Sequence, residues 1–153
     1  MKINIEFDES LTENEICIRC ASLDEEIQRL QAAISDIALG SKKFVCYQEE
    51  KECYIPFHDI LFFETESGHI CVHTKNQVYQ TKLKLYELEE LLPGMFMRVS
   101  KSAILNTDHV YSITKNLAAS SIVEFAGTHK QVYVSRYYYK PLKFKLEERR
   151  NEL

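Results

Sequence analysis

The chain lacks any long apolar run. Its apolar stretches are short and interrupted by charge, so none approaches the roughly 20 residues that a helix needs to cross a bilayer. The opening Met-Lys-Ile-Asn-Ile-Glu also lacks the features of a signal peptide. We therefore expect a soluble cytoplasmic protein, whose 153 residues, 45% of them apolar, can bury one ordinary core.

The sequence also lacks the motifs of common catalytic sites. It contains no glycine-rich phosphate loop, nucleophile elbow or HExxH motif. The nearest set of convergent ligands is His69, Cys71 and His73, which alternate along one expected strand and would share a face suited to a transition metal. Ile70 and Val72 make the same segment an ordinary half-buried strand. We expect no metal, no cofactor and no enzymatic activity.

The five cysteines lack the spacing of a disulfide framework or a zinc ribbon, which predicts reduced and mostly buried thiols. Cys17 and Cys20 are the nearest approach to a redox or metal pair. In the strand expected over residues 15–20, positions three apart face opposite sides, which prevents both sulfurs from reaching one ion. We therefore expect these cysteines to be structural.

Charge is distributed unevenly, although the formal net charge is only −4. Residues 1–41 carry three basic and nine acidic side chains, whereas residues 93–146 carry eight basic and two acidic ones. A basic C-terminal half suits a surface that approaches phosphate groups. On charge alone, an accident of surface composition remains the alternative.

Residues 1–41 predict a small acidic β-β-α segment. Apolar residues alternate over 2–7 and 15–20 as in half-buried strands, and a helix capped by Ser22 is expected to follow and to end at Gly40-Ser41. The apolar face of this helix comprises Leu23, Ile27, Leu30 and Ile34. A unit of this size cannot close its own core, so we expect it to pack on the remainder or on a second copy, as a dimerisation or regulatory element.

Residues 42–153 predict a mainly β (α+β) domain. A leucine-rich helix is expected over 83–92, stopped by Pro93-Gly94, and a second helix is expected after Pro141. Short alternating patterns predict strands at 44–47, 52–56, 60–64, 69–73, 77–81, 97–99, 103–105, 110–114, 121–125 and 130–134.

The most distinctive stretch is PGMFMRVSKSAILNTDHVYSI, residues 93–113. Phe96 and Arg98 precede Ser100-Lys101-Ser102, three apolar residues and Asn106. This order resembles the signature of the LytTR family of bacterial DNA-binding domains, and the resemblance covers about residues 42–145. It implies an elongated arrangement of short antiparallel sheets with one small helix. It also implies that loops between strands, in place of a recognition helix, enter successive major grooves.

The resemblance assigns the first two DNA-contacting loops. His69, after the turn that ends the 60–64 strand, is a candidate for a base contact, since an imidazole both donates and accepts; an exposed histidine with no role is the alternative. In the second loop we assign DNA contacts to Arg98, Lys101 and Ser102. Lys101 stands where family members usually carry arginine, so we expect weaker base discrimination with phosphate attraction retained. Asn106 is expected to tie this loop through its side-chain amide.

A third element, Tyr133 to Lys140, resembles the Val-Ser-Arg-Arg ending of the family, with Tyr137 in place of the second arginine. Two interpretations stay open: Arg136 takes over the base contact, or Tyr137 makes a stacking or phosphate contact. Lys115, Lys140 and Lys143 are expected to neutralise the DNA backbone.

Together these features predict a sequence-specific transcriptional regulator that binds double-stranded DNA as a dimer on repeated half-sites, with no RNA partner. The alternative is a β-rich RNA-binding or protein-interaction module that uses Tyr137–Tyr139 as a stacking platform. Residues 1–41 are too few for a phosphoacceptor receiver domain of roughly 120 residues, so the stand-alone form of the family is implied. That form suggests control by a small membrane regulatory protein.

Overall fold

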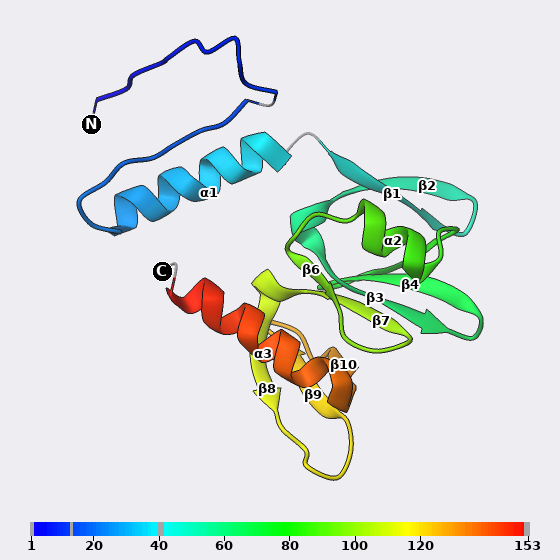
Figure 1. Ribbon diagram of the computed structural model, residues 1–153. Coiled ribbons are helices and arrows are strands. Elements are labelled where there is room, and N and C mark those ends of the chain that lie inside the picture. Colours follow the sequence, from blue (N-terminus) through cyan, green and yellow to red (C-terminus); the bar gives the residue numbers. More distant parts are fainter. Residues whose placement is uncertain (1, 13, 40–41, 152–153) are drawn as a thin grey trace.

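Two antiparallel sheets form the framework of the computed structural model, which describes residues 2–12, 14–39 and 42–151 (Figure 1). The larger sheet has seven strands in the order β2-β1-β5-β4-β3-β7-β6. Their bounds are β1 Lys43–Gln48, β2 Lys51–Pro56, β3 Ile60–Glu66, β4 His69–Thr74, β5 Val78–Thr81, β6 Phe96–Arg98 and β7 Ala103–Asn106. The second sheet has the order β10-β9-β8, with β8 Val110–Thr114, β9 Ser121–Phe125 and β10 Gln131–Val134. This arrangement confirms the predicted mainly β fold of short antiparallel sheets.

Strand β3 is buried on both faces over Ile60–Phe63, and so two cores form. Phe63 belongs to the first core with residues of β1 and the small helix α2 (Leu85–Leu91), where Leu88 is fully buried. Phe62 faces the other way and belongs to the second core with Phe125 of β9 and Leu142 of the C-terminal helix. Neighbouring residues of a strand point to opposite faces, so the unbroken apolar run Ile60–Phe63 supplies both cores. The predicted leucine-rich helix is confirmed as α2.

The N-terminal segment differs from the prediction. Helix α1 spans Glu25–Leu39, but the described residues of 2–7 and 15–20 form no strand. Figure 1 shows this extended segment and α1 lying away from both sheets. The side chains of Ile3, Ile5 and Phe7 are 75–96% exposed, so their alternation has no sheet to join. An isolated pair of strands is marginal in water, which accounts for the failure of the alternating pattern.

Two details of this segment also change. The cap of α1 is Asp24, whose carboxylate accepts a hydrogen bond from the Ile27 amide at 3.0 Å, in place of Ser22. Cys17 and Cys20 are both exposed, whereas Cys46 and Cys71 are buried as expected. The predicted boundary at Gly40-Ser41 lies outside the described residues.

The C-terminal helix α3 spans Arg136–Asn151 and begins five residues before Pro141, where the sequence predicted a start after that proline. Proline cannot donate to the carbonyl of Tyr137, and that loss disfavours a helix through this point. Packing against the second core offsets it: Leu142 is fully buried, and Tyr138 and Tyr139 pack partly buried beside it. Burial of side chains against the second core therefore stabilises the start of α3 at Arg136, although Pro141 disfavours a helix through this region.

Asn106 ties the end of β7 to the rest of the fold. Its side chain is completely buried; Nδ2 donates to the carbonyl of Ile60 at 3.0 Å, and Oδ1 accepts from the amide of Asp108 at 3.0 Å. The second bond caps the 3-10 turn Thr107–His109. Asn106 was expected to tie the loop that carries Lys101, whereas its side-chain amide ties the turn that follows β7 to the start of β3.

Replacing Asn106 with alanine should lower the free energy of unfolding by about 1–3 kcal/mol, because buried polar groups lose their partner. Urea denaturation at neutral pH measures this difference. The matched control is Asn116→Ala: the Asn116 side chain also accepts from an amide two residues on, that of Ala118, but in an exposed loop. Equal losses for both variants would contradict a special role for the buried amide.

Candidate nucleic-acid interface

The first predicted loop is the tight turn between β3 and β4. Ser67 and Gly68 occupy its two central positions with φ of 49° and 81°, the left-handed values of a type I′ turn. Glu66 and His69 face each other across this turn, and the His69 side chain is exposed. The hairpin therefore holds His69 at the tip of two strands, available to a ligand.

The second loop, residues 99–102, joins β6 to β7, and hydrogen bonds from Arg98 hold its backbone in place. The guanidinium donates through Nε to the Ser100 carbonyl at 2.6 Å and through Nη2 to the Lys101 carbonyl at 2.7 Å. Its Nη1 pairs with the carboxylate of Glu89 at 3.0 Å. The fork of Arg98 is thus used inside the protein, while the side chains of Lys101 and Ser102 are exposed.

The third element is the start of α3. Ser135 lies at the residue before the helix, and its carbonyl accepts from the amides of Tyr138 and Tyr139 at 3.0 and 3.1 Å. Arg136 and Tyr137 occupy the first two helical positions and are exposed, Tyr137 by 80%. The amide groups and dipole of a helix N-terminus favour an anion such as a phosphate at this point.

Two backbone hydrogen bonds place the three elements in a row. The Thr65 amide, one residue before the first turn, donates to the carbonyl of Ser102 at 2.8 Å. The Ser135 amide donates to the carbonyl of Val99, at the start of the second loop, at 2.9 Å. The second loop therefore lies between the first turn and α3, although the elements are separated by more than 30 residues in the sequence.

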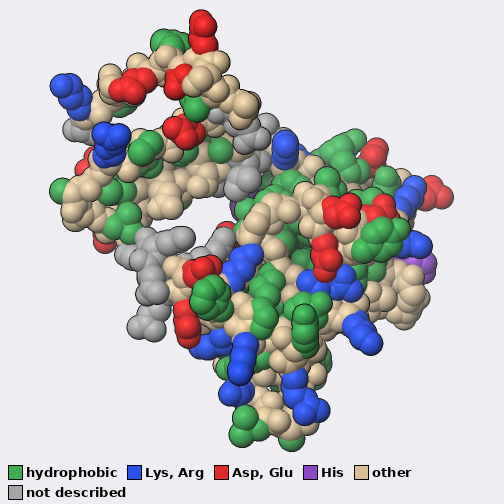
Figure 2. All heavy atoms as spheres, viewed as in Figure 1, with side chains coloured by type: hydrophobic (Ala, Val, Ile, Leu, Met, Phe, Trp, Pro, Cys, Tyr) green, Lys and Arg blue, Asp and Glu red, His purple; other side chains and the backbone are tan. Residues whose placement is uncertain are grey.

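The eight basic side chains of residues 93–146 differ in what they contact. Arg98, Lys130 and Lys145 donate to backbone carbonyls. Lys143 is half-buried and pairs with Glu147 at 3.7 Å on α3. Lys101, Lys115, Arg136 and Lys140 are exposed, and Lys115 lies over the ring of Tyr139 at 5.2 Å from its centre. Figure 2 shows lysine and arginine side chains gathered over the lower part of the molecule, where Figure 1 places α3 and β8–β9. These four residues supply exposed positive charge along the row.

The tyrosine run does not form a continuous stacking platform. Tyr138 and Tyr139 pack partly buried against the second core, and only Tyr137 of the three stands clear of it. The ring of Tyr138 meets that of Tyr137 edge to face at 4.9 Å. A stacking surface for single-stranded RNA would require several aromatic faces open to solvent.

Substituting Arg98 tests whether it positions the loop or attracts DNA. Lysine keeps the charge but loses the planar fork that reaches two carbonyls and Glu89. We expect Arg98→Lys and Arg98→Ala to weaken specific DNA binding by similar factors, measured by fluorescence anisotropy with a labelled duplex. Retention of near wild-type affinity by Arg98→Lys alone would instead mean that the charge contacts phosphate.

Comparison with known proteins decides the family. The model of the LytTr DNA-binding domain family matches residues 50–147. The chain belongs to the LytTR family. An uncharacterized HTH-type transcriptional regulator of Staphylococcus aureus (strain bovine RF122 / ET3-1) is 32% identical over 148 residues, covering 95% of this chain and 98% of the relative. A similarly described protein of strain NCTC 8325 / PS 47 is 30% identical over 146 residues, covering 95% of this chain and 98% of the relative.

A solved LytTR structure has the same fold. The LytTr DNA-binding domain of a response regulator from Bacillus cereus superposes with a TM-score of 0.62 at 23% identity, covering 70% of this chain and 97% of that one. The relatives are described as helix-turn-helix proteins, yet in the described part of this LytTR chain each of the three α-helices is separated from the next by strands. None of the described helices is both long and apolar enough to span a membrane.

Proposed function

We propose that this LytTR protein is a transcriptional regulator that binds double-stranded DNA at specific sequences through the turn at His69, the loop 99–102 and the start of α3. The observation that carries the proposal is the row set by the Thr65–Ser102 and Val99–Ser135 hydrogen bonds. It presents His69, Lys101 and Arg136 from three rigidly connected elements. Loops on a rigid scaffold are well suited to contact base edges, because their side chains are already positioned.

The roles of these side chains differ. His69 and Arg136 are proposed to contact base edges in successive major grooves, and Lys101 to attract phosphate with weak base discrimination. Ser102 at the same loop and Tyr137 beside Arg136 are proposed to contact the backbone. Tyr137 stands in place of the second arginine of the family pattern. Arg136 is therefore the arginine that remains at the start of α3, and we assign the base contact to it.

Lys115 and Lys140 are proposed to neutralise flanking phosphates. Each such contact adds affinity for every sequence and releases a counterion, so it appears in the salt dependence and not in sequence preference. The separation of salt-dependent from sequence-dependent contacts is therefore a direct test of these assignments.

We also propose that residues 1–41 mediate dimerisation, so that two copies bind repeated half-sites. An apolar groove of about 450 Å³ supports this proposal; it lies between the extended segment and α1 and is lined by side chains that include Ile16, Ile18, Leu23, Ile27 and Ile34. Figure 1 shows the extended segment and α1 lying away from both sheets, and a partner would bury these apolar side chains. Family resemblance also suggests a small membrane regulatory protein as a partner.

In vitro selection from random duplexes, followed by light scattering on a duplex with two selected sites, tests the function and the stoichiometry separately. We expect one enriched motif and two chains per two-site duplex. A monomer in solution and on that duplex would refute the dimer while leaving DNA binding intact.

A further inference from the structure

The antiparallel register of β3 and β4 gathers metal-binding side chains on one face of the hairpin. Glu64 lies directly opposite Cys71, and Phe62 lies opposite His73 two residues further along. Alternate residues of a strand point to the same side, so Glu64, Glu66 and His73 share a face. In the sequence, His69, Cys71 and His73 were the nearest set of ligands and no metal was expected. Cross-strand pairing instead brings the carboxylates of Glu64 and Glu66 to His73.

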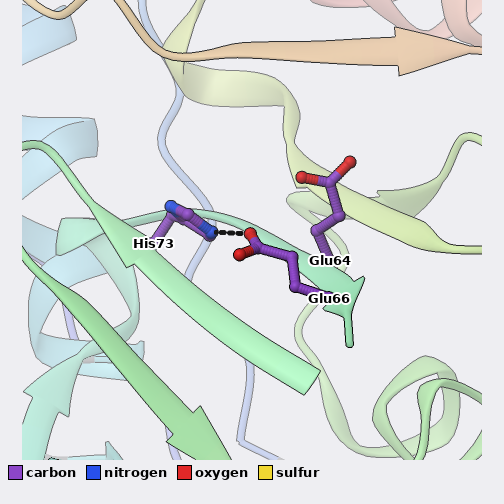
Figure 3. Close-up of side chains that lie close together, drawn as sticks. All are labelled: Glu64, Glu66 and His73. Carbon is purple, nitrogen blue, oxygen red and sulfur yellow. Dashed lines mark hydrogen bonds and ion pairs between the residues drawn. The ribbon is translucent and has the colours of Figure 1, made fainter. Parts of the chain in front are cut away.

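These side chains converge closely. The carboxylates of Glu64 and Glu66 and the imidazole of His73 each offer one ligand atom, and the three atoms lie within 4.8 Å of one another (Figure 3). Oε1 of Glu66 is 2.7 Å from Nε2 of His73, so the imidazole is aimed into the group. Ligand atoms about 2.1 Å from a zinc ion lie roughly 3.4 Å apart in a tetrahedral site. Rotation of the two carboxylates can bring the three ligand atoms from within 4.8 Å of one another to that separation.

The surrounding packing fixes His73 beside the two carboxylates. The imidazole is nine-tenths buried and stacks on Phe62 at 4.2 Å between ring centres. Burial and the nearby charge of Glu66 raise the pKa of the Glu64 carboxyl. Lys130 donates to the carbonyls of Thr74 and Gln77 and, within the described residues, forms no ion pair with either carboxylate.

We propose that Glu64, Glu66 and His73 bind one divalent transition-metal ion of the zinc type. Two carboxylates and a neutral imidazole balance the charge of Zn²⁺, and imidazole selects zinc-type ions over the oxygen-preferring Mg²⁺ and Ca²⁺. Binding would cross-link β3 to β4 at the base of the turn that carries His69. This site is independent of the DNA-binding proposal.

The test uses the full chain, stripped with a chelator and titrated with Zn²⁺ by calorimetry. Cys17 and Cys20 are exposed, so both are first replaced with serine to remove them as adventitious ligands. We expect one Zn²⁺ per chain in this background, an increase in Tm on binding, and no comparable heat with Mg²⁺ or Ca²⁺. Binding of Mg²⁺ as tight as that of Zn²⁺ would overturn the proposed metal class.

Glu64→Gln is the decisive variant, because the Glu64 carboxylate takes part in no described hydrogen bond or ion pair and its loss should leave the Tm without metal unchanged. We expect it to weaken Zn²⁺ binding at least tenfold. The control is Glu90→Gln on the exposed side of α2, which should bind Zn²⁺ as the parent does. The proposal is overturned if no Zn²⁺ binds, or if Glu64→Gln and Glu90→Gln bind it equally.

Discussion

Alanine at both Lys101 and Arg136 is expected to remove most of the sequence-specific DNA binding. A side chain that contacts a base contributes about 1–3 kcal/mol, so Arg136→Ala should lose roughly 5- to 150-fold in affinity for the selected duplex. Lys101→Ala, which removes phosphate attraction and only weak base discrimination, should lose less. The two residues lie on separate elements joined through Val99 and Ser135. If they act independently, the two losses should add in the double variant. Fluorescence anisotropy on the selected duplex measures these losses.

Two controls separate specific from general effects. Lys140→Ala should weaken binding to all duplexes alike and reduce the slope of log affinity against log salt by about one unit. Lys51→Ala changes an exposed lysine of β2, an edge strand distant from β3 in the sheet order, and should have little effect. Unchanged binding of both Lys101→Ala and Arg136→Ala to the selected site would refute the proposed surface.

Replacing Phe63 with alanine should be the most destabilising of the changes considered. The Phe63 ring is fully buried and meets Phe44 and Phe96 edge to face at 5.2 and 5.7 Å. Truncation of a buried phenylalanine costs about 3–5 kcal/mol, a large share of the 5–15 kcal/mol that stabilises a typical domain. Urea denaturation measures the loss, and Phe63→Leu provides a milder variant that stays folded if the alanine variant does not.

The matched control for Phe63 is Phe144, whose side chain is 65% exposed on α3. Phe144→Ala should change the free energy of unfolding by no more than about 0.5 kcal/mol. Equal effects of the two substitutions would mean that Phe63 does not lie in the core as described.

Local patterns predicted the strands and α2 because burial leaves a visible pattern in the sequence. The leucines of α2 recur on one helical face, and the unbroken apolar run Ile60–Phe63 marks a strand buried on both faces. The alternating pattern failed at Ile3 and Ile5, because a strand also needs a partner and pairing is not encoded locally. Nor did local pattern reveal that α3 begins at Arg136, since burial of Leu142 against distant strands decides it.

The candidate interface was predicted in its parts but not in its assembly. His69, Lys101 and Arg136 were named from three separate segments, and only the hydrogen bonds of Thr65 and Ser135 reveal their order in space. Arg98 was predicted to contact DNA, whereas its three guanidinium nitrogens are used by two carbonyls and Glu89. Every residue has a backbone carbonyl, so the sequence does not indicate which carbonyls accept from Arg98. The role of Arg98 in positioning the loop 99–102 could therefore be recognised only in the folded structure.

The most direct test of DNA recognition is a competition experiment on the full chain. The selected duplex is labelled, and a scrambled duplex and a single-stranded RNA of equal length compete for binding at about 0.15 M salt. The proposed function predicts that the selected duplex binds at least about 10³-fold more tightly than the scrambled duplex, with RNA no better than the latter. Equal competition by scrambled duplex, or tighter binding of the RNA, would contradict it.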